Sequence, residues 1–311
     1  MGNIDDIFRA GGSTASLSID LGLLLDLPGR WEGKGFNLIA RPARQGVATN
    51  PTFFLELNAT HETLEFTAIG GDIPNRGEIE PTVLLHGLHY LQSVSDCEDG
   101  SGIHKEPGLW VHVPPTAANT SETYVRQASI PHGDSLVAQS SFFKSLAGGP
   151  VIDPVDAFPI PIPNPIPPLN DVTHPVITDP TYLQPYLNDP LPGECLPKGL
   201  VAAKTIRDPT EVLRAQIKGQ TIQQTSVIAI TTSFPSPLTT SPTVQGIVNI
   251  PFVTRNANTT QMDAIFWIEK VTHPKIANRH FMQLQYVQRV ILDFAGIHWP
   301  HFSVATLIKA S

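Results

Sequence analysis

Apolar and polar residues alternate along most of this chain, which is the pattern of β-strands with one buried face. The range 281–294 shows it most clearly, with Met282, Leu284 and Tyr286 on one face and Gln283 and Gln285 on the other. Turn-forming Gly, Pro and Asn separate the alternating segments. The sequence therefore predicts about ten to twelve strands, in the ranges 29–36, 53–58, 63–69, 83–94, 102–114, 123–130, 135–143, 221–232, 246–253, 263–271, 281–294 and 301–309.

The connections between many of these strands are short, so consecutive strands should pair antiparallel. An all-β fold with this many strands leaves two exposed edges unless the sheet closes on itself. We therefore expect a closed antiparallel up-and-down β-barrel of about ten strands. A jelly roll is the main alternative.

One helix is predicted at 208–219, where Asp208 can act as N-cap, Pro209 suits the first turn and Gly219 marks the end. The range 150–197 holds 14 of the 30 prolines. Proline lacks the backbone donor that a central strand needs, so this range should be extended and lie across the barrel surface. A PxxP recognition ligand is the alternative interpretation.

The predicted organisation is a single β-barrel domain over 1–311. Its expected parts are a lead-in at 1–20, a first barrel half at 21–149, the Pro-rich insertion at 150–200, and the helix with the second barrel half at 201–311.

The composition narrows the expected partners. The net charge is −8, and 20 Lys plus Arg form no basic run, which argues against nucleic acid. No apolar run reaches the length of a membrane-spanning helix, so we expect no membrane segment. There is no glycine-rich phosphate loop and no GxSxG motif. A small-molecule ligand or substrate is the expected partner, and a homo-oligomer remains open.

The cysteines and the N-terminal residues bear on the cellular location. Cys97 and Cys195 lie 98 positions apart, a spacing that fits neither a zinc site nor a dense disulfide framework. The first residues lack the basic region and long apolar run of a secretory signal. Both observations favour a cytoplasmic protein.

Candidate chemistry gathers between Gly102 and Gly133, where two histidines stand in short motifs. His104 and Glu106 are two positions apart in a predicted strand, so their side chains should point the same way. His132 follows at a predicted turn. An HxE motif recurs by chance, so His104 can equally be a hydrogen-bonded barrel histidine and Glu106 a solvated charge.

Three motifs follow one another along the chain: Gly29-x-Trp31-x-Gly33-x-Gly35, His104-x-Glu106-x-Gly108, and His301-Phe-Ser-Val-Ala-Thr-Leu307. Their order resembles that of the nitrobindin-like haem-binding β-barrel family, a lipocalin-like barrel. The resemblance implies a b-type haem in one mouth of the barrel, with His301 as the axial iron ligand. The last motif has one residue more between its histidine and leucine than the family pattern, so His298 is an alternative ligand. The family domain is about half this length, which leaves the Pro-rich insertion unexplained.

The haem hypothesis gives each candidate residue a role. A histidine-ligated iron with an open sixth position binds NO, O₂ or peroxide, and a distal His or Arg favours peroxidase chemistry. The candidate distal or catalytic residues are His104, His132, Arg126 and Arg289. The candidate haem-binding residues are His301, His298, Trp31, Trp299 and Glu106, with His301 as the metal ligand.

Two other functions use the same residues differently. His104, Glu106 and His132 could form the two-histidine, one-carboxylate site of a non-haem iron oxygenase, although His132 follows closely and sits at a turn. Alternatively the protein is a lipocalin-like carrier of an apolar molecule, and its histidines are incidental.

Overall fold

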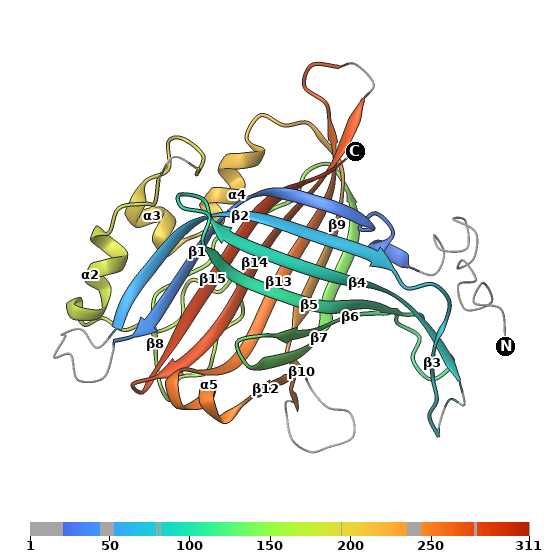
Figure 1. Ribbon diagram of the computed structural model, residues 1–311, viewed down its shortest axis with the longest axis horizontal. Coiled ribbons are helices and arrows are strands. Elements are labelled where there is room, and N and C mark those ends of the chain that lie inside the picture. Colours follow the sequence, from blue (N-terminus) through green and yellow to red (C-terminus); the bar gives the residue numbers. More distant parts are fainter. Residues whose placement is uncertain are drawn as a thin grey trace.

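Ten long antiparallel strands close into a β-barrel in the computed structural model of the chain (Figure 1). The structure describes residues 21–43, 53–78, 80, 82–193, 195–234, 244–276 and 279–310, and the predicted lead-in at 1–20 lies outside them. The first and last barrel strands pair with each other, which closes the sheet. The predicted all-β, closed up-and-down barrel is thus confirmed.

The barrel strands follow their sequence order around the wall. They are β1 (Gly29–Pro42), β2 (Phe53–Ala68), β4 (Val83–Asp96), β5 (Gly102–Val113), β6 (Thr123–Ile130), β7 (Asp134–Ala147), β9 (Ile222–Thr231), β13 (Asn258–Thr272), β14 (His280–Phe294) and β15 (Ile297–Lys309). The short strands are β3 (Ile73–Asn75), β8 (Ile160–Pro161), β10 (Ser233–Phe234), β11 (Val244–Gln245) and β12 (Ile247–Asn249). The helical segments are η2 (Gly22–Leu24), α2 (Pro180–Asn188), α3 (Ala202–Arg207), α4 (Thr210–Ile217) and α5 (Pro251–Asn256).

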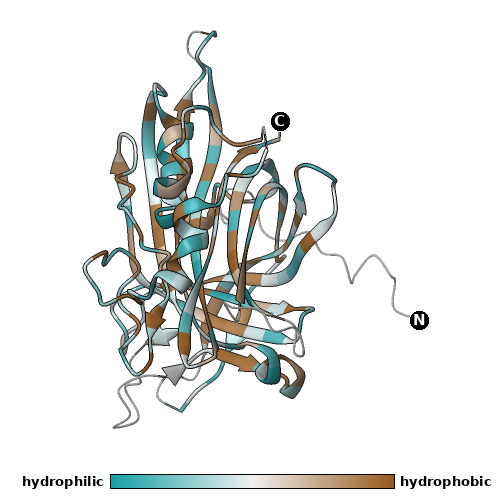
Figure 2. Cartoon of the chain, turned by 90° about the vertical axis from the view of Figure 1, so that its left-hand side faces the viewer, coloured by the Kyte–Doolittle hydropathy of each residue, from teal (hydrophilic) through white to brown (hydrophobic). Residues whose placement is uncertain are grey.

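The alternation of the strands produces two separate cores, and apolar and polar positions interchange along the ribbons in Figure 2. One core fills part of the barrel interior and includes Trp31, Leu64 and Leu307. The other lies on the outer wall, where Phe36 and Phe302 of the barrel meet the Pro-rich insertion and its helices. Both faces of β1 and β15 are therefore buried, whereas strands such as β7 cover one core only.

Glycines in β1 allow it to lie close against β15. A Cβ at Gly33 would come within 2.1 Å of the backbone oxygen of Thr306. A Cβ at Gly35 would come within 2.3 Å of the Val304 oxygen. Only glycine lets the two backbones approach this closely. The GxWxGxG segment thus serves the closure of the barrel.

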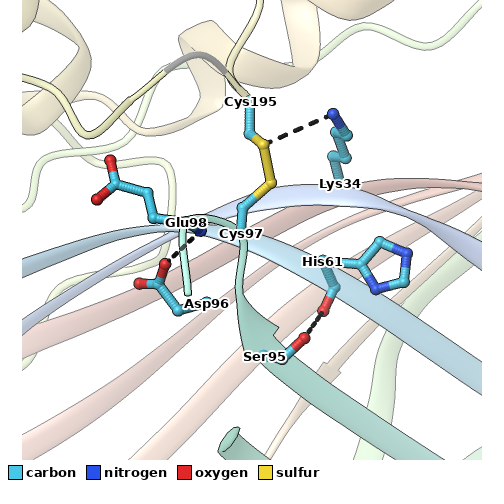
Figure 3. The surroundings of a disulfide bond; sticks show 7 residues. All are labelled: Lys34, His61, Ser95, Asp96, Cys97, Glu98 and Cys195. Atoms are coloured by element: carbon cyan, nitrogen blue, oxygen red, sulfur yellow. Dashed lines mark hydrogen bonds between the residues drawn. A yellow bond between two sulfur atoms is a disulfide. The ribbon is translucent and has the colours of Figure 1, made fainter. Parts of the chain in front are cut away.

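The Pro-rich insertion crosses the outer surface of the barrel, as predicted, and α2 and α3 lie beside the ends of β1 and β2 (Figure 1). Its β8 pairs with the start of β15. A disulfide joins Cys195 of the insertion to Cys97, directly after β4 (Figure 3). Disulfides persist mainly in oxidising compartments, so this bond weighs against the reducing environment that the cysteine spacing suggested.

Several predicted elements differ from the structure. Ranges 53–58 and 63–69 form one continuous strand, β2. The range 246–253 was predicted as a strand, but β12 ends at Asn249 and α5 begins at Pro251, because proline suits the first turn of a helix. The predicted helix forms as α4, and α2 and α3 were not predicted. None of the helices among the described residues is long and apolar enough to cross a membrane.

Candidate functional site

A cavity of about 380 Å³ lies inside the barrel next to the interior core, and Leu136, Met262 and Tyr286 belong to both. Its walls come from strands around the barrel, and α5 contributes Val253 beside it. The apolar lining residues are Ile39, Val94, Ile103, Ile130, Leu136, Ile247, Val253, Ala257, Met262, Val290 and Leu292. The polar lining residues are Asn37, Arg41, Glu56, Glu62, Gln92, His104, His132, Asp134, Ser135, Thr259, Tyr286, Gln288, His301 and Ser303. Three of the histidines singled out from the sequence therefore face one cavity.

His301 projects from β15 into this cavity and is held by β1. Its Nε2 lies 2.8 Å from Oδ1 of Asn37, which also accepts a hydrogen bond from Ser303. The amide nitrogen of Asn37 donates to Asn58, which fixes the orientation of the amide. An amide oxygen only accepts, so in this arrangement Nε2 carries the proton and Nδ1 keeps its lone pair. Burial, followed by the nearby charges of His104 and His132, lowers the pKa of His301 to about 3. Its imidazole is therefore neutral at physiological pH.

His104 is held from behind by a buried ion pair. Its Nε2 lies 3.2 Å from Oε2 of Glu106, whose other oxygen accepts hydrogen bonds from Arg126 and Tyr90. Burial alone would raise the pKa of Glu106, but the Arg126 guanidinium and the hydrogen bonds outweigh it and hold the pKa at about 2. Glu106 is thus a permanent carboxylate that orients the His104 ring. The predicted common orientation of His104 and Glu106 is confirmed.

His132 lies next to His104 in the cavity wall. The two rings stack, with centroids 5.4 Å apart and an angle of 17° between their planes. Burial and the charge of His104 lower the pKa of His132. Asp134, two residues on, has a raised pKa because it is partly buried. Gly133 between them has a φ of 117°, and a Cβ there would lie 2.6 Å from the Ile250 side chain that precedes α5.

A second polar group lies at the boundary between the cavity and the interior core. The Tyr286 hydroxyl donates to Oε2 of Glu62 at 2.5 Å, and Gln92 donates to both side chains. Glu62 is completely buried, and this burial raises its pKa despite the donors around it. The group therefore places a buried carboxyl and its hydrogen-bond donors beside the cavity.

The other predicted site residues lie away from the cavity lining. Arg126 is 2% exposed and is occupied by Glu106, Tyr90 and Gln288. Trp31 belongs to the interior core of the barrel and donates to the Leu27 oxygen. Three others are packed or paired elsewhere: Trp299 stacks on Phe294, His298 bonds Asp293 at 2.6 Å, and Arg289 pairs with Asp263 at 2.7 Å.

The described part of the chain contains no group of three His, Cys, Asp or Glu side chains that could hold a metal ion. The predicted facial triad of His104, Glu106 and His132 therefore finds no support among these residues. Its physical obstacle is Glu106, because one of its oxygens is taken by Arg126 and Tyr90 and the other faces His104. Both oxygens of Glu106 are therefore already engaged by neighbouring side chains.

Comparisons with known proteins add little to this picture. No family model matches the chain, and no curated protein is significantly similar. A solved structure described as "Crystal Structure of Rv2717c from M. tuberculosis" is similar at a TM-score of 0.41 and 11% identity, covering 94% of this chain and 98% of that one. A likeness at this level carries no argument about function. The closed barrel is compatible with a lipocalin-like fold, and the nitrobindin-like resemblance stays a prediction.

Sequence reasoning did not find Asn37, Glu62, Gln92 or Tyr286 as cavity residues. Each belongs to an ordinary alternating strand and stands in no recognisable motif, which is a weak signal for a site residue. Their partners are distant in sequence: Asn37 and His301 are 264 residues apart, and Glu62 and Tyr286 are 224 apart. Only the closure of the barrel brings these pairs together.

Proposed function

We propose that this protein binds and carries a small, largely apolar molecule in the barrel cavity, and that haem is the first candidate ligand. The cavity volume of about 380 Å³ falls within the usual range of small-molecule sites. Apolar walls with a few converging polar groups are the common composition of such sites. The observation that carries the proposal is the neutral imidazole of His301 facing this space.

The donor chemistry of the site fits haem. Iron ligation needs a neutral imidazole whose other nitrogen is oriented by an acceptor. His301 is neutral, and Asn37 supplies the acceptor. In this role His301 would hold the iron. When bound, haem would supply an iron that reacts with NO, O₂ or peroxide. His104 and His132 would be the polar residues beside such a ligand, whereas Arg126 is committed to Glu106.

A metal-free carrier is the second candidate, because the Asn37–His301 hydrogen bond that would orient a metal ligand serves equally to hold His301 in the cavity wall. Nε2 of His301 is engaged by Asn37, which is itself tied to Asn58 and Ser303. Through these hydrogen bonds His301 forms part of the cavity wall. In a carrier, the apolar residues would hold the body of the ligand, and the histidines would recognise its polar end.

Absorption titrations separate the two candidates. Haemin added to the purified protein should give a saturable Soret band with low-micromolar affinity. His301→Ala should shift or abolish this band, whereas His298→Ala should leave it unchanged, because His298 is paired with Asp293 outside the cavity lining. A protein that shows no specific haemin binding but takes up an apolar alcohol is a metal-free carrier. Failure to bind either ligand would refute the proposed function.

A further inference from the structure

We propose that the cavity prefers an apolar molecule that ends in a carboxylate, and that His104 and His132 hold this carboxylate while the protein takes up a proton. The inference rests on the proposed binding of a small molecule in the cavity, and it specifies the chemical class of that molecule.

The first observation is the convergence of three imidazoles. The rings of His104 and His132 stack 5.4 Å apart, and both line the cavity together with His301. The charges of His104 and His132 reach His301, since both lower its pKa. Stacked imidazoles that are both protonated repel each other, so without an anion this cluster disfavours a second positive charge.

The second observation is the balance of charge around the cluster. Glu106 is the carboxylate next to His104, but its charge is matched by Arg126 at 2.5 Å. At the rim of the cavity, Arg41 and Glu56 form their own pair at 2.6 Å. Among the described residues that line the cavity, the other carboxylates are therefore Glu62 and Asp134.

Of these two carboxylates, Glu62 is bonded to Tyr286 and Gln92, whereas Asp134 lies near the imidazoles and attracts them. Burial raises the pKa of Glu62, and its hydrogen bonds run to Tyr286 and Gln92. Burial also raises the pKa of Asp134, although the histidines act in the opposite direction. With Glu106 matched by Arg126, Asp134 is left to serve two imidazoles, so the cluster still provides a favourable place for an external anion.

The consequence for binding follows from electrostatics in a poorly solvated site. An anion that enters the cavity stabilises the charged form of a neighbouring imidazole and raises its pKa. A carboxylate should therefore bind together with a proton, and binding should tighten as the pH falls from 8 to 6. Val290, Leu292 and Ile39 line the same cavity and provide contacts for the apolar body of the ligand.

The test uses decanoate and decan-1-ol, which share a chain length and differ in charge. Isothermal titration calorimetry in two buffers with different heats of ionisation measures the number of protons taken up on binding. At pH 6 we expect decanoate to bind at least about tenfold more tightly than decan-1-ol, with uptake of about one proton. His104→Gln and His132→Gln should each weaken decanoate about tenfold and reduce the proton uptake, while decan-1-ol, which carries no charge, is affected less.

His298→Gln is the matched control and should leave both ligands unaffected, because His298 lies outside the cavity lining and bonds Asp293. Circular dichroism confirms that each variant is folded, and His132→Asn replaces His132→Gln if the latter is not. Equal binding of decan-1-ol and decanoate without proton uptake would overturn this inference and leave the proposed function standing. Proton uptake that survives in both cavity variants would overturn it as well. Binding of neither ligand would refute this inference together with the carrier.

Discussion

The imidazole of His301 and the amide of Asn37 meet across the junction that closes the barrel, with Nε2 2.8 Å from Oδ1. Asn37 lies on β1 and pairs in register with Ser303, two residues beyond His301 on β15. The hydrogen bond that orients the candidate ligand-binding histidine thus depends on the pairing of the first and last strands. His301 can therefore make this hydrogen bond only when the barrel has closed.

Acidification should destabilise the protein through His301. In the unfolded chain its pKa has the ordinary value of about 6.5, whereas burial lowers it to about 3 in the folded protein. Between these values the unfolded state binds the additional proton. The stability present above pH 6.5 is therefore lost as the pH falls, by up to about 1.4 kcal/mol per pH unit. Denaturant unfolding between pH 7 and pH 4 measures this slope. It should be shallower in His301→Gln, and an equal slope would contradict the assignment to His301.

Glu106 should be required for stability more than any surface carboxylate. Glu106→Gln leaves the Arg126 guanidinium buried without its partner, which should cost about 3–5 kcal/mol of unfolding free energy. The control is Glu65→Gln, which breaks an exposed pair with Arg30 and should change stability by less than about 1 kcal/mol. Similar losses of unfolding free energy in the two variants would show that the buried pair stabilises the protein no more than the exposed one.

The disulfide should stabilise the attachment of the Pro-rich insertion to the barrel. Cys97 and Cys195 are separated by 98 residues, and a crosslink over a loop of this length is expected to contribute about 4–5 kcal/mol by restricting the unfolded chain. Reductant should lower the melting temperature of the native protein and leave Cys195→Ser unaffected. Alkylation of both cysteines in the native, unreduced protein would contradict the bond, whereas protected cysteines would support an oxidising compartment.

The barrel could be predicted because strand alternation is a local property. Each of the ten barrel strands coincides with one or two predicted segments, and the range 123–130 matches β6 completely. Apolar runs without alternation were less informative. The segment around Ile250 was predicted as a strand, although Pro251 starts a helix there. Helix α2 was missed because it lies in the Pro-rich range and contains Pro185.

The candidate site could be predicted only in part. His104 and His132 stood out through their short motifs and His301 through the family resemblance, and all three line the cavity. Their surroundings depend on side chains far away in the sequence. The sequence offered Arg126 as a distal residue, but its position next to Glu106 in the folded barrel commits it to an ion pair.

Binding of haemin and decan-1-ol to Ala257→Trp tests most directly whether the cavity is the ligand site. Ala257 lines the cavity at the end of α5, so an indole there should fill part of the space. Phe252→Trp is the control, because Phe252 is 70% exposed on the same helix. The account predicts that Ala257→Trp weakens, by at least about tenfold, whichever of the two ligands the native protein binds, while Phe252→Trp binds like the native protein. Unchanged affinity in a folded Ala257→Trp protein would contradict the central claim.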